Sequence, residues 1–185
     1  ECRIQSQKIM DSEAVVLIFH HFQTYNPIYF VNLRIMKLVI QRVIEASVSI
    51  VGELHNAIGQ GLMVLVGVAE GDTPDDVRWL ASKCVAMRIF SDDAGVMNRS
   101  LADVDGELLA VSQFTLCAST RKGNRPSYIR AAGHDIAIPL YEMFCDECSS
   151  LLGKEVKKGV FGADMQVSLV NDGPVTIVID SKLKD

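Results

Sequence analysis

Two short segments place polar side chains where they could hold a substrate. The first is Ser112-Gln113-Phe114-Thr115, which follows the apolar run Leu108–Val111. Hydroxyl and amide groups at the carboxyl end of a strand can hold a carbonyl group or a water molecule. The same groups can instead satisfy the backbone where the strand ends, so the pattern alone leaves both interpretations open.

The second segment is Asn171-Asp172-Gly173-Pro174-Val175-Thr176. Its residue types indicate a turn between two strands, because glycine adopts backbone angles closed to other residues and proline fixes φ. By itself this segment predicts a turn and no chemistry.

A cluster of basic residues is the third feature. Arg121, Lys122 and Arg125 lie within five residues, in a chain whose net charge is −5. Proteins that grip long stretches of nucleic acid usually carry a broad basic surface, because affinity comes largely from neutralised phosphates. We therefore expect any RNA contact to be local, as for an enzyme that handles an RNA terminus. A solvated loop is the alternative interpretation.

The usual hydrolase motifs are missing. The sequence has no G-x-S-x-G, no H-E-x-x-H and no pair of metal-spaced Cys/His clusters. His55, in an expected turn, and His134, before an expected helix, have no evident nucleophile partner. The pair Cys145 and Cys148 falls late in that helix rather than at its start, which favours a structural role over a redox role. We expect no metal and no cofactor.

The elements that position these segments alternate between strands and helices. Thr73-Pro74 predicts a helix start, with Thr73 as the cap, and residues 77–85 continue with the spacing of an amphipathic helix. A second helix is expected from about Asp135 to Leu152. Two helices cannot cover both faces of so many strands, so we predict an α/β fold, a three-layer α/β/β domain with both helices on one side. The expected strands cover residues 37–43, 46–51, 62–69, 88–90, 107–115, 156–160, 165–171 and 175–180.

Residues 1–35 lack this regularity. We interpret them as an extension outside the fold and residues 36–181 as the functional domain. No apolar run approaches the roughly 18 residues of a membrane helix, and five cysteines without a disulfide-like spacing favour a reduced, cytoplasmic protein.

Taken in order, eight motifs resemble those of the D-aminoacyl-tRNA deacylase family. They extend from residue 36 to the end of the last expected strand without a large gap, and the ordered set is far more specific than any one motif. The motifs are Met36–Val43, Gly59–Leu62, Leu65–Val68, Ser112–Thr115, Arg121–Gly123, Arg125–Ser127, Gly159–Met165 and Asn171–Thr176.

The resemblance implies a homodimer that removes D-amino acids from the acceptor end of tRNA. It also implies removal of glycine from Gly-tRNA(Ala). A Gly-cis-Pro element, Gly173-Pro174, would enter the partner's pocket and exclude L side chains with main-chain carbonyl groups, and Arg42 would brace that element. The tRNA 2′-OH would assist hydrolysis. Expected site residues are Ser112, Gln113 and Thr115 for catalysis; Phe114, Gly173, Pro174, Asn171, Arg42 and Met165 for substrate; and Arg121, Lys122 and Arg125 for tRNA.

Two other interpretations stay open. Thr115 could be the nucleophile, although the sequence shows no base to activate it. The chain could also be a nucleic-acid-binding protein without enzymatic activity; its net charge and the lack of an aromatic and basic platform in the sequence argue against duplex binding.

Overall fold

The computed structural model describes residues 36–182. The expected extension, residues 1–35, lies outside the described residues. The elements, in order, are β1 Lys37–Ile50, β2 Glu53–Ile58, β3 Gly61–Gly67, α2 Pro74–Ala86, β4 Phe90–Ser91, β5 Met97–Arg99, β6 Glu107–Ser112, the 3-10 helix η1 Phe114–Cys117, α3 His134–Leu152, β7 Lys157–Lys158 and β8 Met165–Asp180.

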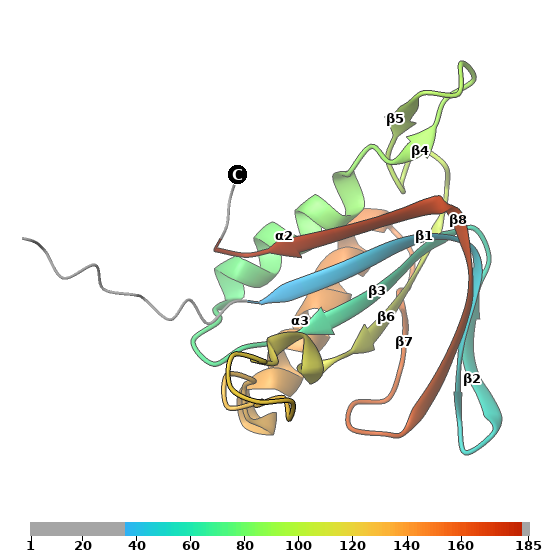
Figure 1. Cartoon of the computed structure of the whole chain (residues 1–185). Helices are drawn as coiled ribbons and strands as arrows, with labels where there is room; N and C mark the ends of the chain where they lie inside the picture. Colours follow the sequence, from blue (N-terminus) through green and yellow to red (C-terminus); the bar gives the residue numbers. More distant parts are fainter. Residues whose placement is uncertain (1–35, 183–185) are drawn as a thin grey trace, which may run out of the picture. The chain divides into compact units, whose positions relative to one another are not determined.

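Strand β1 organises the sheet. Its first half pairs with β3 and its second half with β2, while β8 pairs with it from Lys37 to Ile50. The order β2-β1-β3-β6-β7 continues through the parallel pairs β3–β6 and β6–β7. Strands β4 and β5 form a separate hairpin, which projects beyond the sheet (Figure 1).

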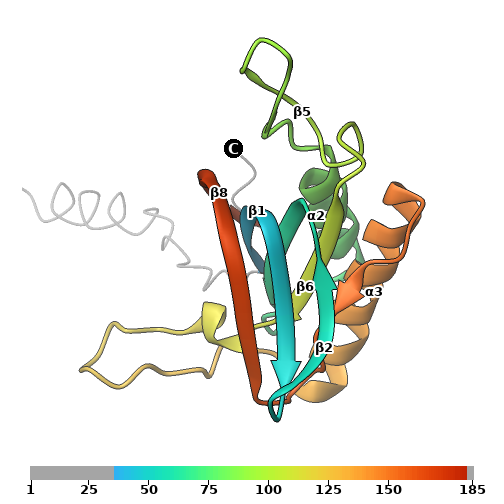
Figure 2. The ribbon, with the colours of Figure 1, turned by 90° about the vertical axis from the view of Figure 1, so that its right-hand side faces the viewer.

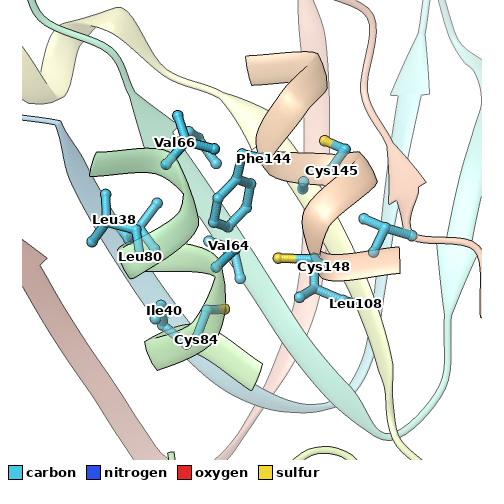
Figure 3. Packing of buried hydrophobic residues seen from close by; sticks show 14 of the residues in the cluster. Leu38, Ile40, Val64, Val66, Leu80, Cys84, Leu108, Phe144, Cys145 and Cys148 are labelled. Carbon is cyan, nitrogen blue, oxygen red and sulfur yellow. The ribbon is translucent and has the colours of Figure 1, made fainter. Parts of the chain in front are cut away.

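The core has two parts, one on each side of β3 and β6. Helices α2 and α3 cover one face, where residues of both helices surround Val64 and Val66 (Figure 3). On the other face, Met63, Leu109 and Val111 pack against the second half of β1 and the first half of β8. Figure 2 shows α3 and β8 on opposite sides of β6. The predicted α/β/β layering is confirmed.

The cysteines of both helices belong to this core. Cys84, Cys145 and Cys148 are free and buried, and Cys84 on α2 lies near Cys148 on α3 (Figure 3). Burial raises the pKa of Cys145 to about 12, and a hydrogen bond with Cys84, together with burial, raises the pKa of Cys148. Such thiols stay protonated and unreactive, so the structural interpretation of the C-x-x-C pair is confirmed.

Helix α2 begins as predicted. The Thr73 hydroxyl accepts from the Asp76 backbone, and the Asp76 carboxylate accepts from the Thr73 backbone, which together form a capping box. The second predicted helix is also confirmed, as α3 from His134 to Leu152.

Several predicted strand limits were wrong. The expected break at Glu45 is absent because β8 pairs with β1 on both sides of it. For the same reason the two expected closing strands are one strand, β8. The strand expected to reach Thr115 ends at Ser112, and the turn expected at His55 lies inside β2. None of the helices in the described part is long and apolar enough to cross a membrane.

The buried carboxyl group of Asp72 should make stability depend on pH. Its carboxylate accepts hydrogen bonds from the backbone nitrogens of Met36 (2.9 Å) and Ala69 (2.6 Å), yet burial dominates and raises its pKa to about 6. A raised folded-state pKa gives stability that is present below the unfolded value and is lost as pH rises through the folded one. The contribution of Asp72 to the free energy of unfolding should therefore fall, by up to about 3 kcal/mol, between about pH 4 and pH 6.

Chemical denaturation across this range measures the slope in the wild type and in Asp72→Asn, which cannot ionise at this position. The variant should lack this component of the slope. An identical pH profile in both proteins would show that Asp72 is not the group responsible.

Candidate functional site

A cavity of about 510 Å³ opens where β6 ends, next to the start of α3. Ser112, Gln113 and Phe114 line one side of it, and Met165, at the start of β8, lines another. The structure thus brings together four of the predicted site residues from two distant parts of the chain. Because a cavity of this size can bury a small ligand, it is the candidate binding site.

The Ser112–Thr115 segment owes its shape to the neighbouring strand. The backbone nitrogen of Gln113 donates to Val66 O at 2.7 Å, after which the chain turns into η1. Gly67 permits this close approach, since a Cβ there would lie 3.0 Å from Gln113 O and 2.8 Å from Leu116 Cβ.

Thr115 differs from its neighbours, because it is not among the residues that line the cavity. Its hydroxyl oxygen accepts a hydrogen bond from the Gln113 side-chain amide at 2.6 Å. An amide group cannot remove a proton from a hydroxyl, so this contact orients Thr115 without activating it as a nucleophile.

Three polar residues of the cavity were not predicted as site residues from the sequence: His134, Tyr141 and Asp164. The Tyr141 hydroxyl donates to Ala110 O at 3.0 Å, and burial raises the pKa of Tyr141, which keeps it neutral. The His134 ring packs edge-on against Phe161, with centroids 5.6 Å apart. His134, Ala137 and Tyr141 follow one another at three- and four-residue spacing, and this helical periodicity could have indicated their common face.

Gly173-Pro174 lies outside this cavity. The peptide bond between the two residues is cis, as predicted, and Gly173 has φ +115°. Both residues are inside β8, where the pairing with β1 is interrupted: Thr176 pairs with Gln41 and Asn171 with Val43. The segment between them therefore leaves the ladder without ending the strand, so the turn interpretation was wrong.

Arg42 holds this interruption. Its Nη1 donates to Ile89 O at 2.5 Å, its Nε lies 2.9 Å from Oδ2 of Asp172, and its guanidinium carbon is 6.0 Å from the centre of the Phe90 ring. A Cβ on Gly173 would lie 3.0 Å from Arg42 Nη2. Arg42 is buried. Its contacts therefore connect β8, through Asp172, with the segment before the β4–β5 hairpin, through Ile89.

Two buried polar atoms beside Gly173-Pro174 make no hydrogen bond within residues 36–182: Asn171 Oδ1 and Arg42 Nε, whose ion pair lacks hydrogen-bond geometry. The Asn171 amide nitrogen, in contrast, donates to Gln41 Oε1 at 2.9 Å. Buried polar atoms are almost always satisfied in proteins. The region therefore has hydrogen-bonding capacity that one described chain does not use.

The three basic residues lie on a loop that projects from the body of the described part (Figure 2). Backbone hydrogen bonds between Ser119 and Ser127, 2.8 and 2.9 Å long, close its base. Arg121, Lys122 and Arg125 are exposed, and none forms an ion pair with a carboxylate that the structure describes.

Comparison with known proteins identifies the family. The family model for D-Tyr-tRNA(Tyr) deacylase matches residues 39–180. The chain belongs to the D-Tyr-tRNA(Tyr) deacylase family. Membership makes the protein an enzyme of a hydrolase family.

Relatives of this D-Tyr-tRNA(Tyr) deacylase family member match it over their own full length. D-aminoacyl-tRNA deacylase from Porphyromonas gingivalis is 62% identical over 150 residues, 81% of this chain and 100% of the relative. The protein of the same name from Akkermansia muciniphila is 61% identical over the same shares of both chains.

Two solved structures share the deacylase fold. The c-Myc DNA unwinding element binding protein superposes with TM-score 0.73 at 39% identity, covering 77% of this chain and 97% of its own. A probable eukaryotic D-amino acid tRNA deacylase superposes with TM-score 0.70 at 18% identity, covering 79% and 99%, which shows the fold alone.

The contacts of Gly173 predict the effect of a single methyl group. In Gly173→Ala the Cβ would approach Val175 Cγ2 to 2.9 Å and Arg42 Nη2 to 3.0 Å, so the Val175 side chain, the Arg42 guanidinium or the segment itself must shift. Gly153→Ala is the matched control, because Gly153 also has positive φ, +67°, but no atom within 4 Å of an added Cβ. Each variant should lose about 1–2 kcal/mol of stability from backbone strain.

Deacylation of D-aminoacyl-tRNA, measured on folded protein, should separate the two. Gly173→Ala should lose at least about tenfold in rate, whereas Gly153→Ala should stay close to the wild type. Equal rates in the two variants would show that the position of the Gly173 segment does not matter for activity.

Proposed function

We propose that the protein hydrolyses D-aminoacyl-tRNA, and Gly-tRNA(Ala), to free amino acid and tRNA while it spares L-aminoacyl-tRNA. The observation that carries the proposal is the cavity lined by Ser112, Gln113 and Phe114, in a chain 62% identical to a D-aminoacyl-tRNA deacylase over that relative's whole length. The three residues and Met165 bind the aminoacyl end of the tRNA.

The site is completed by a second copy of the chain. Gly173-Pro174 lies outside the cavity of its own chain, and β8 pairs only with β1 among the described strands, so its other edge is open. Val178, 66% exposed, is a large apolar side chain on that strand. Unpaired strand edges and unsatisfied buried atoms are both features that a partner chain can satisfy. These features support a homodimer.

In that homodimer Gly173-Pro174 enters the partner's cavity and presents main-chain carbonyl groups to the substrate. A main-chain carbonyl group of the protein that faces the substrate's α-carbon, on the side where an L side chain would project, excludes that side chain. It leaves room for hydrogen or a D side chain. Rejection of this kind is negative selection. Arg42 is the brace, because its contacts with Asp172 and Ile89 fix where the two residues lie. Asn171 belongs to the same segment.

Catalysis rests on the substrate. The carbonyl carbon of the ester is attacked by water, the ester bond to the ribose breaks, and the adjacent 2′-OH of the terminal adenosine assists. Ser112 and Gln113 orient the aminoacyl group from the cavity wall, and Thr115, outside that lining, positions Gln113, whose side-chain amide donates to the Thr115 hydroxyl. Arg121, Lys122 and Arg125 contact phosphates near the acceptor end.

Residues 36–181 form the deacylase domain in this proposal, and residues 1–35 lie outside it. We place the protein in the cytoplasm, where buried free thiols such as Cys84 and Cys148 stay reduced.

One observation favours a second function, binding of nucleic acid without hydrolysis. The solved structure at 39% identity is of a protein named for binding a DNA unwinding element. A net charge of −5 argues against duplex binding. Binding to a DNA duplex in the absence of any deacylation would favour this alternative.

The proposed function predicts that the enzyme selects D-aminoacyl and glycyl substrates over L-aminoacyl substrates. The dimer should release D-tyrosine, D-aspartate and glycine from charged tRNA and leave the L-aminoacyl counterparts intact, because only the L side chain meets the partner's carbonyl groups. Release of radiolabelled amino acid measures each rate. Equal rates on D- and L-substrates, or no release from either, would refute the proposed function.

A further prediction tests whether the tRNA 2′-OH or Thr115 carries catalysis. Thr115→Ala should keep substantial activity, while a charged tRNA that ends in 2′-deoxyadenosine should be nearly inert. Removal of a protein nucleophile normally costs several orders of magnitude. A loss of that size in folded Thr115→Ala, with the deoxy substrate still cleaved, would instead identify Thr115 as the nucleophile.

A further inference from the structure

An aromatic pair lies at the rim of the cavity. The rings of Phe114, on η1, and Tyr128, on the basic loop, meet edge to face with centroids 5.1 Å apart and planes at 71°. The two residues are 55% and 40% exposed. An edge-to-face contact leaves ring faces uncovered, so the pair presents apolar aromatic surface to solvent.

The pair is continuous with both the cavity and the basic loop. Phe114, which precedes the loop, and Ala131, which follows it, both line the cavity, so the segments that flank the loop reach the cavity. Tyr128 lies next to Ser127, whose backbone hydrogen bonds with Ser119 close the base of the loop.

The basic loop before Tyr128 differs from several other basic residues of the described chain in having no carboxylate partners. Lys154, Lys158 and Lys182 each pair with a carboxylate elsewhere in the fold. The loop residues Arg121, Lys122 and Arg125 pair with none that the structure describes, so their charge is available to an anionic ligand. Exposed aromatic rings beside unpaired cations are the combination that binds single-stranded nucleic acid, because bases stack and phosphates are neutralised.

We propose that Phe114 and Tyr128 form a stacking platform for the unpaired nucleotides that precede the terminal adenosine of the substrate. The sequence conceals this platform, since the two residues are separated by the loop and become neighbours only when its base closes. The proposal rests on the proposed function, because the cavity is taken to hold the aminoacyl end. It makes Tyr128 a specificity residue that reads the single-stranded end of the RNA.

The test measures binding rather than hydrolysis. Fluorescence anisotropy gives the Kd for an uncharged acceptor-stem RNA with an unpaired 3′ end and for the same stem with a blunt end. The wild type should prefer the unpaired end. Tyr128→Leu should bind that RNA about tenfold more weakly, as expected for a lost base stack, and should bind the blunt stem as before.

Two control variants locate the effect. Tyr128→Phe keeps the ring and should behave as the wild type. Ile129→Ser removes a neighbouring apolar side chain that is 81% exposed and should also leave the preference unchanged. Replacement of Arg121, Lys122 and Arg125 with alanine should weaken the binding of both RNAs and reduce the salt dependence of that binding.

Three results would overturn the platform: equal binding of the two RNAs by the wild type, an unchanged preference in Tyr128→Leu, or dissociation of the dimer in Tyr128→Leu by sedimentation, which would assign the ring to the subunit interface. The deacylation assay stands apart from this result. A protein that prefers the unpaired end but releases no D-amino acid would support the platform and refute the proposed function.

Discussion

The pairing of β1 with β8 is the constraint on which the other features depend. The two strands run together from Lys37 to Ile50 and from Asp180 to Met165, so almost every backbone group of β1 has its partner determined. The pairing is irregular at two neighbouring points: between Gln41 and Val43, where Asp172–Val175 leave the ladder, and between Val43 and Glu45. Because regular pairing holds on both sides, the interrupted segment cannot drift along the strand, and the Arg42 contacts with Asp172 and Ile89 then fix its position.

The same pairing keeps two groups of site residues apart in one chain. Met165 begins β8 at the cavity, whereas Gly173 and Pro174 lie further along the strand, outside the lining of that cavity. A 16-residue strand cannot fold back on itself while it stays paired. If Gly173-Pro174 contacts a substrate in such a cavity, the cavity belongs to another copy. The open edge of β8 and the unsatisfied Asn171 Oδ1 lie on the strand that such a copy would meet.

The sequence predicts what local pattern determines. The helix start at Thr73, α3 and the layering follow from capping and periodicity, and the cis bond followed from the resemblance. Strand limits were harder, because Glu45 looks like a break and only its pairing with Val170 of β8 shows that the strand continues. The cavity face of His134 and Tyr141 and the meeting of Phe114 with Tyr128 depend on how distant segments pack. Spacing along a single sequence does not reveal such contacts, although the three- and four-residue steps from His134 to Tyr141 were a usable signal.

Complementation between two impaired chains tests the shared site most directly. One chain carries Gly173→Ala with an intact cavity, and the other carries Ala131→Trp, which fills the cavity but leaves Gly173-Pro174 intact. After dissociation and mixing, half of the dimers are mixed and each holds one intact site, so about a quarter of wild-type deacylation should return. If mass measurements show mixed dimers and the mixture is no more active than the two parent variants, Gly173-Pro174 does not act in the partner's cavity and the shared-site proposal is wrong.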